Sequence, residues 1–563
     1  MSVLLLLPLL LPQAPRPAQE LGPAAPSGTG PAVAAVGDRS AVLFLDAAGR
    51  VQVRVSDGHG LTWTPSVRLD ADPTGAARIV PPRAVAIDGD TIACLWLDAR
   101  LSTAATPQFD AWLSVSTDGG ATWSAEQVLE KGHPHGPAYS VLDAAVAVSG
   151  PRIHVAQLVA GAAGGEPWLV SSGDAGATWT APLAAASVPA DAEELALAAA
   201  PGAVHLAWSD DRNAAGLDDL WFRTSLDGGL GWTGAESRLD ASGPGNGDLT
   251  APGLVLVPAG AKLCLAWLEN RLPTSPLDDE LHFRASTDGG LSWGPEQVVA
   301  SGADADDPSL SFCGCNASLA WVDDRTGQDE VYTAVSVDLG ATWRRHRLSS
   351  GGGLRPVARG RADLLGVAFL TPGPPAAARI AVTRDEGLNW LPELDLDDAP
   401  IGAGAGLRLA FDEKYKNFIA AWVDAGTAGN RIRVGGMRTP TLLPTGNFTP
   451  GGAVSFAVAA FPIDEAGLPF AVPIAGGPGH YTPPFPGAYD LGLADDPWLR
   501  ASLNLIPGPL SGLLAADGTG ATPLLVLPSA IPPGSLLHAA AVSFAVPGPT
   551  LKTITDVVVT PVQ

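Results

Sequence analysis

Two patterns of apolar and polar residues, a continuous apolar run and an alternating run, recur along the first four fifths of this 563-residue chain. Short apolar runs such as "CLWLD", "HLAWSD" and "SLAWVD" are each followed by a run that alternates, such as "DAWLSVS", "DLWFRTS" or "EVYTAVS". Alternation with period two, rich in β-branched and aromatic residues, is typical of β-strands. Since no stretch has the spacing of an amphipathic helix, the patterns predict an all-β fold.

Most alternating runs end in an eight-residue turn sequence, S-x-D-x-G-x-T-W, which we call the box. It is clearest in "STDGGATW" (116–123). The Asp can accept hydrogen bonds from backbone N–H groups of its own turn, and the fifth-position Gly can adopt a positive φ. The final Trp offers a large apolar surface to an adjacent sheet. The other copies span 56–63 (with Gly58 where Asp is expected), 172–179, 225–232, 286–293, 336–343 and 383–390.

The boxes recur at intervals of roughly 50 residues, a period typical of propeller blades. The apolar strand, taken as the inner strand of each unit, aligns in eight units rather than seven. The aligned positions are Phe44, Trp96, Gln157, Trp208, Trp267, Trp321, Phe369 and Trp422. We therefore predict an eight-bladed β-propeller over residues 31–443, with seven blades and a stray hairpin as the alternative. The outer strand of the last blade is either Thr439 to Leu443 or a segment before Pro31.

The boxes resemble the Asp boxes of the bacterial neuraminidase repeat, which is found in sialidases and in many secreted sialidase-like propellers. The resemblance covers about residues 31–437. It implies that each box is a turn between the third and fourth strands of a blade, at the perimeter and away from the central pocket. Catalytic members usually have six blades, whereas the units here favour eight. The boxes are thus expected to build the fold and not the site.

The two ends of the chain differ from the repeat. The apolar run from Val3 to Leu11 is too short to span a bilayer and fits a secretory signal. We predict a signal peptide and Pro-rich lead over 1–22, no transmembrane anchor, and a secreted or cell-surface (periplasmic or extracellular) protein. Residues 446–563 lack boxes and alternate apolar runs with Pro-Gly turns, which predicts a C-terminal β-sandwich-like module for packing or surface attachment.

Composition argues against nucleic acid, metals and cofactors as partners. With 33 Lys and Arg against 58 Asp and Glu, the net charge is −25, which argues against nucleic-acid binding. Cys94 and Cys264 lie in apolar strands and are expected in the core. Cys313 and Cys315 flank a glycine at a hairpin tip, either as two thiols or as a local disulfide. We expect no cofactor, no metal and a monomer.

A first set of candidate residues follows the aligned strands and repeats from blade to blade. These residues could grip sugar hydroxyls or a carboxylate. Alternatively, each acid holds its own loop and pairs with the nearby Arg, which the repetition favours because a catalytic site needs different residues from different blades. The set comprises Asp98, Arg100, Asp210, Asp211, Arg212, Glu269, Arg271, Asp323, Asp324 and Arg325.

A second set does not repeat and lies in loops that lead into the units, where cations and carboxylates could ring a central pocket. Its members are Arg78, Arg83, His133, His135, Tyr139, Asp191, Glu193, Glu194, Asp248, Asp304, Asp306, Asp307, Arg355 and Arg359. The sialidase resemblance implies three arginines on a substrate carboxylate, a Tyr nucleophile activated by a Glu, and an Asp acid. "RIVP" at Arg78 resembles the family's Arg-Ile-Pro signature, with a valine inserted.

The catalytic candidates on this view are Tyr139 with Glu193 or Glu194, and Asp248 or Asp307. No third arginine is assigned, so the hydrolase set is incomplete. The leading hypothesis is therefore an exported, non-catalytic propeller that binds a glycan or protein through its central face. The alternative is a glycoside hydrolase of exo-sialidase type.

Overall fold

The computed structural model is all-β over its described residues. It describes residues 16–24, 30–412 with gaps (the longest at 72–82, 103–107, 130–139, 250–254, 272–278 and 397–405), most of 417–437, and short stretches from 441 to 561. The chain divides into two units, a larger one from Pro15 to Gly436 and a smaller one from Met437 onward, with residues 415–417 grouped with the smaller unit. In the described part, no helix is long and apolar enough to cross a membrane.

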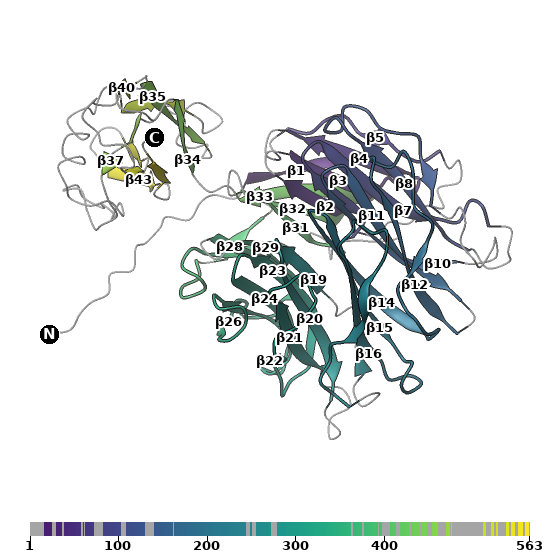
Figure 1. Ribbon diagram of the computed structural model, residues 1–563. Coiled ribbons are helices and arrows are strands. Elements are labelled where there is room, and N and C mark those ends of the chain that lie inside the picture. The colour runs from purple at the N-terminus through teal and green to yellow at the C-terminus, as the bar shows by residue number, and fades with distance from the viewer. Residues whose placement is uncertain are drawn as a thin grey trace. The chain divides into compact units, whose positions relative to one another are not determined.

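The larger unit is an eight-bladed β-propeller, as predicted (Figure 1). The first strand of each blade lies at the axis of the propeller. Each first strand contacts the first strands of the two neighbouring blades. The first strands are β2 (Ala32–Val36), β6 (Val85–Asp88), β10 (Val141–Ser149), β14 (Ala192–Ala200), β19 (Val255–Ala259), β23 (Ala305–Cys313), β27 (Leu354–Arg361) and β31 (Arg408–Asp412). Blades 1 to 8 are numbered in this order. A short extra strand, β18 (Asp248–Leu249), pairs with the far end of the second strand in blade 5.

The aligned apolar strands are the second strands of the blades, and our prediction that they are the inner ones was wrong. They are β3 (Arg39–Leu45), β7 (Thr91–Asp98), β11 (Arg152–Ala160), β15 (Ala203–Asp210), β20 (Lys262–Asn270), β24 (Asn316–Asp323), β28 (Leu364–Thr371) and β32 (Asn417–Gly426). Strand β7 is buried along its whole length, because blades pack on both of its faces. That burial on both sides explains the continuous apolar runs.

The third strands carry the alternating pattern. They are β4 (Val51–Ser56), β8 (Asp110–Ser116), β12 (Gly165–Ser172), β16 (Asp219–Ser225), β21 (Glu280–Ser286), β25 (Glu330–Ser336), β29 (Ala377–Thr383) and β33 (Gly429–Met437). Their aromatic residues pair across the ladder with the aligned positions, for example Trp112 with Trp96 and Trp221 with Trp208. These cross-strand aromatic pairs fix the register of each blade.

The outer strands include one from the start of the chain. They are β5 (Val67–Arg68), β9 (Gln127–Val128), β13 (Leu183–Ala184), β17 (Thr233–Arg238), β22 (Gln297–Ala300), β26 (Arg344–Arg347), β30 (Leu394–Asp395) and, in blade 8, β1 (Arg16–Pro23). Strand β1 pairs antiparallel with β33, so the segment before Pro31 closes the ring. Residues 16–22, expected in the lead, thus belong to the propeller, while the apolar run 3–11 lies outside the described residues.

Each box forms the turn after the third strand. In the second box, Ser116 Oγ accepts the N–H of Gly120 at 2.7 Å and donates to the Asp118 carboxylate at 2.8 Å. That carboxylate also accepts the N–H and hydroxyl of Thr122 at 2.8 and 2.6 Å. Gly120 has φ +90°, and a Cβ there would lie 2.6 Å from Val55 in the preceding blade. Both constraints require glycine.

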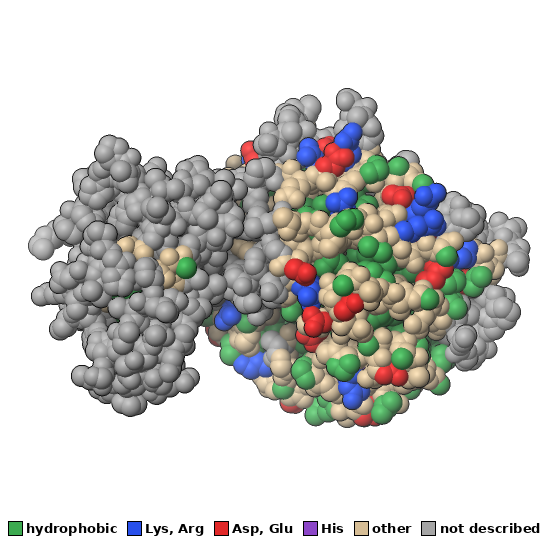
Figure 2. All heavy atoms as spheres, turned by 90° about the horizontal axis from the view of Figure 1, so that it is seen from above, with side chains coloured by type: hydrophobic (Ala, Val, Ile, Leu, Met, Phe, Trp, Pro, Cys, Tyr) green, Lys and Arg blue, Asp and Glu red, His purple; other side chains and the backbone are tan. Residues whose placement is uncertain are grey.

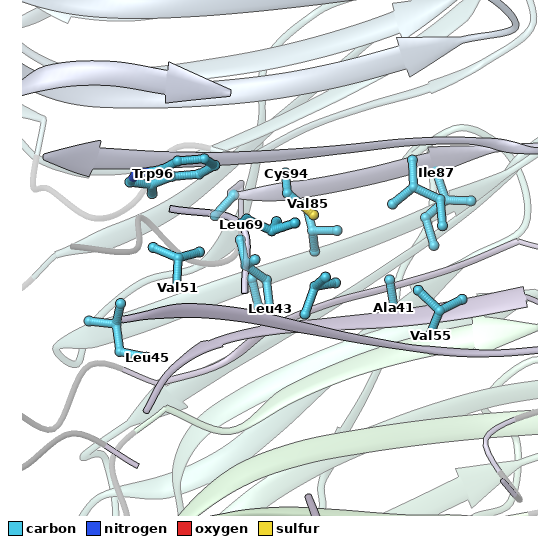
Figure 3. Close-up of a cluster of buried hydrophobic side chains, with 14 of the residues drawn as sticks. Ala41, Leu43, Leu45, Val51, Val55, Leu69, Val85, Ile87, Cys94 and Trp96 are labelled. Atoms are coloured by element: carbon cyan, nitrogen blue, oxygen red, sulfur yellow. The ribbon is translucent and has the colours of Figure 1, made fainter. Parts of the chain in front are cut away.

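The box tryptophans pack on the preceding blade. The ring of Trp293 meets Phe222 edge-on with centroids 5.0 Å apart, and Trp343 meets Phe283 in the same way. The core accordingly lies between blades. Figure 3 shows one such cluster, in which Leu43 and Val51 of blade 1 lie opposite Cys94 and Trp96 of blade 2. The repeat therefore stabilises the ring one interface at a time.

The smaller unit contains short strands in three sheets. They are β34 (Thr441–Gly446), β35 (Ala453–Ala459), β36 (Pro469–Ala471), β37 (Ile474–Ala475), β38 (Ser511–Leu513), β39 (Gly520–Ala521), β40 (Leu525–Val526), β41 (Leu536–Ala539), β42 (Val542–Ala545), β43 (Thr550–Ile554) and β44 (Val558–Pro561). Strand β34 pairs with β35, so the Thr439–Leu443 segment is not the closing strand of the propeller. The β-sandwich assignment for this unit stays a prediction.

Candidate functional site

The repeating candidates form ion pairs within their own blades. In blade 2, Arg100 donates from Nε to Asp98 Oδ2 and from Nη1 to Glu126, at 2.8 and 2.7 Å. Its guanidinium also lies 4.2 Å above the centre of the Trp112 ring. Asp98 is completely buried, so its charge is balanced by Arg100 inside the blade.

The same arrangement recurs in blades 4, 5 and 6. Arg212 bonds Asp210 and Glu236, Arg271 bonds Glu269 and Glu296, and Arg325 bonds Asp323. Asp211 accepts the N–H of Asp191 at 3.1 Å, and Asp324 accepts the N–H of Asp304 at 3.2 Å. These carboxylates thereby join each second strand to the loop that enters its own blade. The geometry uses the whole set for holding loops and strands.

Several non-repeating candidates lie outside the described residues. These are Arg78, His133, His135 and Tyr139, and the side chain of Asp248 in β18 is likewise not described. Of the others, Asp191 accepts the N–H of Gly165 at 2.7 Å, Glu194 is buried and Glu193 is exposed. The predicted pairing of Tyr139 with Glu193 or Glu194 therefore stays a prediction.

Four arginines from three blades converge on the axial strands. We call Arg83, Arg355, Arg359 and Arg408 the arginine cluster. Arg355 and Arg359 lie on β27, Arg408 begins β31, and Arg83 lies just before β6. The other three are close enough to Arg408 to lower its pKa. Arg408 was not among the sequence candidates. The only signal for it was a cation that interrupts the apolar run "GLRLAF".

Arg83 differs from the rest of the cluster because it has an acidic partner. Its Nη2 lies 2.7 Å from Asp143 Oδ2 on β10, and its Nη1 donates to the carbonyl of Leu195 on β14. This side chain therefore reaches from blade 2 to the first strands of blades 3 and 4. Its charge is partly balanced, and it ties three blades together near the axis.

Arg359 and Arg408 have no acidic partner among the described residues. Each donates from Nη1 to the carbonyl of the residue before it, at 2.7 Å for Arg359 and 2.8 Å for Arg408. Burial lowers the pKa of Arg359. Burial, followed by the charges of Arg355 and Arg359, lowers the pKa of Arg408 to about 10. The Arg408 Nε is buried and has no hydrogen-bond partner among the described residues.

Carboxylates gather beside the cluster, on and around β23. The pKa of Asp306 is raised to about 6, chiefly by desolvation and then by the nearby charges of Asp304 and Asp307, with smaller contributions from Asp279 and Asp329. Asp304 also accepts the N–H of Asp279 at 3.2 Å. Within the described residues, no group of three or more His, Cys, Asp or Glu side chains could hold a metal ion.

The charges elsewhere on the propeller are mixed. On the face seen in Figure 2, acidic and basic side chains lie interspersed among apolar ones. At the axial strands, by contrast, arginines gather on β27 and β31 and carboxylates on β23. The separation of charges marks this region as the candidate site.

Comparison with known proteins gives no family and only distant structural similarities. No family model matches the sequence, and no curated protein matches it. Among solved structures, the α-L-arabinanase of Penicillium chrysogenum bound to arabinobiose is 16% identical, with a TM-score of 0.34 over 51% of this chain and 90% of its own. The polysaccharide lyase Uly1 is 9% identical, with a TM-score of 0.44 over 67% and 94%. The sialidase of Trypanosoma rangeli bound to the inhibitor DANA is 10% identical, with a TM-score of 0.36 over 86% and 88%.

Proposed function

We propose that this protein binds a carboxylate-bearing ligand, with acidic sugars the first class to test, through Arg355, Arg359 and Arg408. One observation supports this above the others: Arg359 and Arg408 are partly buried cations that form no ion pair with an acid among the described residues. A buried charge without a counter-ion is costly, and a ligand carboxylate would supply the missing partner. Guanidinium groups also match carboxylates with paired hydrogen bonds.

The choice of sugars rests on the resemblance of the boxes to those of sialidases. The arabinanase, the polysaccharide lyase and the sialidase named above are too distant from this chain to decide its ligand. The repeating ion pairs are a poor alternative site, because each arginine there already has an acidic partner.

The test compares acidic and neutral sugars by isothermal titration calorimetry, using 3′-sialyllactose, galacturonate oligomers and lactose. We expect the acidic sugars to bind at least about tenfold more tightly than lactose. Arg408→Met and Arg359→Met should each remove about tenfold or more in affinity, because each deletes a charge-assisted hydrogen bond. Arg344→Met is the matched control, since Arg344 lies on β26 and pairs with Glu386. Equal binding of lactose, or unchanged binding by both variants, would contradict the proposal.

A second candidate function, glycoside hydrolysis, is favoured by Asp306. A carboxyl whose pKa is about 6 is partly protonated near neutral pH, as a general acid must be. The assay is hydrolysis of a fluorogenic sialoside by the parent protein, Asp306→Asn and Tyr139→Phe. We expect binding without turnover. Turnover in the parent that both substitutions abolish would make the protein a sialidase-type hydrolase instead.

A further inference from the structure

The first strands of blades 6 and 7 carry the same irregularity with opposite charges. In β23, Asp306 pairs with Val322 and Ser309 with Ala320, so Asp307 and Pro308 together face the single residue Trp321. In β27, Leu354 pairs with Leu370 and Val357 with Ala368, so Arg355 and Pro356 together face Phe369. Such bulges re-aim side chains. Asp307 and Arg355 thus occupy equivalent places in neighbouring blades.

Both residues also share an unusual backbone conformation. Asp307 has φ +48° and Arg355 has φ +53°, although neither is glycine, and each is followed by proline. The two strands are joined directly: Ser309 Oγ accepts the N–H of Ala358, and Ser311 Oγ donates to the carbonyl of Gly360, both at 3.0 Å. The carboxylate and the guanidinium are therefore held by adjacent, connected strands.

These opposite charges do not neutralise each other. Among the described residues, neither Asp307 nor Arg355 has an ion pair or a side-chain hydrogen bond, and both are exposed. The charges that chiefly act on Asp306 are all carboxylates, which keep its pKa raised. Three of the four charges that chiefly act on Arg408 are arginines, and the fourth is Asp307, which raises its pKa. The carboxylates on β23 therefore lie close to the arginines without an ion pair between them among the described residues, and a molecule with two opposite charges would complement both groups.

We propose that the ligand is an acidic sugar with a free amino group, whose ammonium is held by Asp306 and Asp307 and whose carboxylate is held by Arg355, Arg359 and Arg408. This inference rests on the proposed function and narrows its ligand class. An acidic sugar whose nitrogen is acetylated would satisfy the arginines and leave the two aspartates without a partner. The free amine gives both ends an opposite charge, so it is the better fit.

The experiment uses two matched pairs of probes that differ only at nitrogen. They are the methyl glycoside of neuraminic acid and its N-acetyl form, and muramic acid and its N-acetyl form. In titrations with the full chain at pH 7.5, we expect at least one free amine to bind about tenfold or more tightly than its acetylated partner. Asp307→Asn and Asp306→Asn should each reduce that ratio toward one. Arg355→Gln should weaken both members of a pair.

Glu386→Gln is the matched control, because Glu386 is an acid in the blade 7 box, at the opposite end of that blade. It should leave every affinity unchanged, and thermal melting of each variant checks that it is folded. Equal or tighter binding of both acetylated forms, still dependent on Arg408, would overturn this inference and leave the proposed function standing. Binding of all four probes that ignores Arg408 would instead contradict the proposed function.

Discussion

Removing Arg212 should destabilise the propeller strongly, because its partner cannot be hydrated once it is gone. The Arg212 side chain is 7% exposed and that of Asp210 is 1% exposed. Arg212 donates from Nε and Nη2 to the two oxygens of Asp210, at 2.7 and 2.5 Å, and from Nη1 to Glu236 at 2.5 Å. It also covers the Trp221 ring at 3.9 Å from its centre.

The magnitude follows from what Asp210 keeps in Arg212→Ala. Its remaining partners are the Trp208 Nε1, at 2.8 Å, and the N–H of residue 212, at 3.3 Å. Breaking a buried pair by removing one partner costs about 3–5 kcal/mol, and these two donors place the loss near the lower end, at about 3 kcal/mol. The lost contact with Trp221 adds about 0.5–1 kcal/mol.

Arg325 provides the matched comparison within the same repeat. It bonds Asp323 as Arg212 bonds Asp210, but its side chain is 38% exposed. The Asp323 side chain is as buried as that of Asp210, but the Arg325 position is open to solvent, so water can enter beside Asp323 and the pair is already screened. Arg325→Ala should therefore cost less, about 1 kcal/mol. The contrast between these two arginines tests burial together with the second acidic partner, Glu236, that only Arg212 has among the described residues.

The assay is urea unfolding followed by tryptophan fluorescence, with the slopes compared to confirm that the same transition is measured. Arg325→Ala as damaging as Arg212→Ala, or a stable Arg212→Ala, would refute the reasoning. Titration with 3′-sialyllactose adds a second readout. If Arg212 held the ligand rather than the fold, its removal would abolish binding and leave the unfolding midpoint unchanged.

Three further predictions concern the box, the thiols and the ring closure. Hydrogen bonds from Thr122 and Ser116 lower the pKa of Asp118 to about 2, below the unfolded value of about 4. The stabilisation by Asp118 is therefore present above pH ~4 and is lost as pH falls toward 2. Asp118→Asn should flatten the pH dependence of the unfolding midpoint in that range, and an unchanged slope would count against this prediction. Iodoacetamide should label exposed Cys315 in the native protein but Cys94 and Cys264 only after unfolding, since both are buried with raised thiol pKa; mass spectrometry showing equal rates would contradict this. Deleting residues 1–23 should lower the melting temperature by several degrees and promote aggregation, because it uncovers the edge of β33; calorimetry and gel filtration showing neither change would remove β1 from ring closure.

The repeat could be predicted from the sequence because its signals are local. The box combines Ser, Asp and Gly within one turn, and each of these residues has a bond or a backbone angle that the others cannot supply. The count of eight units followed from the aligned strand, whose aromatic residues pair with those of the third strand. Because these constraints act between residues close in sequence, the sequence pattern is enough to predict them.

The position of that strand within the blade could not be predicted, because two strands in each blade are buried. The first strands crowd together at the axis, where small side chains such as Ala144, Ala196 and Ala198 fit between blades. Their runs are therefore weaker in large apolar residues than the second strands, and the second strands were mistaken for the inner ones. The closing strand was left open for a similar reason, since pairing between β1 and β33 joins residues about 400 positions apart.

The candidate site was predicted in part, and its missing member shows what the pattern lacks. Arg83, Arg355 and Arg359 drew attention because they interrupt loops or strand starts without repeating. Arg408 sits inside an apolar run, and only the folded ring brings it beside arginines of blades 2 and 7. These arginines come together only when the ring closes, and the spacing of residues along the sequence does not predict which blades become neighbours at the site.

The arginines that repeat from blade to blade differ from those that do not in whether an acid balances their charge. A charge that recurs in several blades must be balanced in each of them, or its cost is multiplied, and Arg100, Arg212 and Arg325 each have an acid two residues away. Arg359 and Arg408 break that rule, because they do not repeat and lie partly buried without an ion pair to an acid among the described residues. The stable blades around them can absorb that cost. A ligand anion would balance these cations, and for this reason we place the proposed site at the arginine cluster.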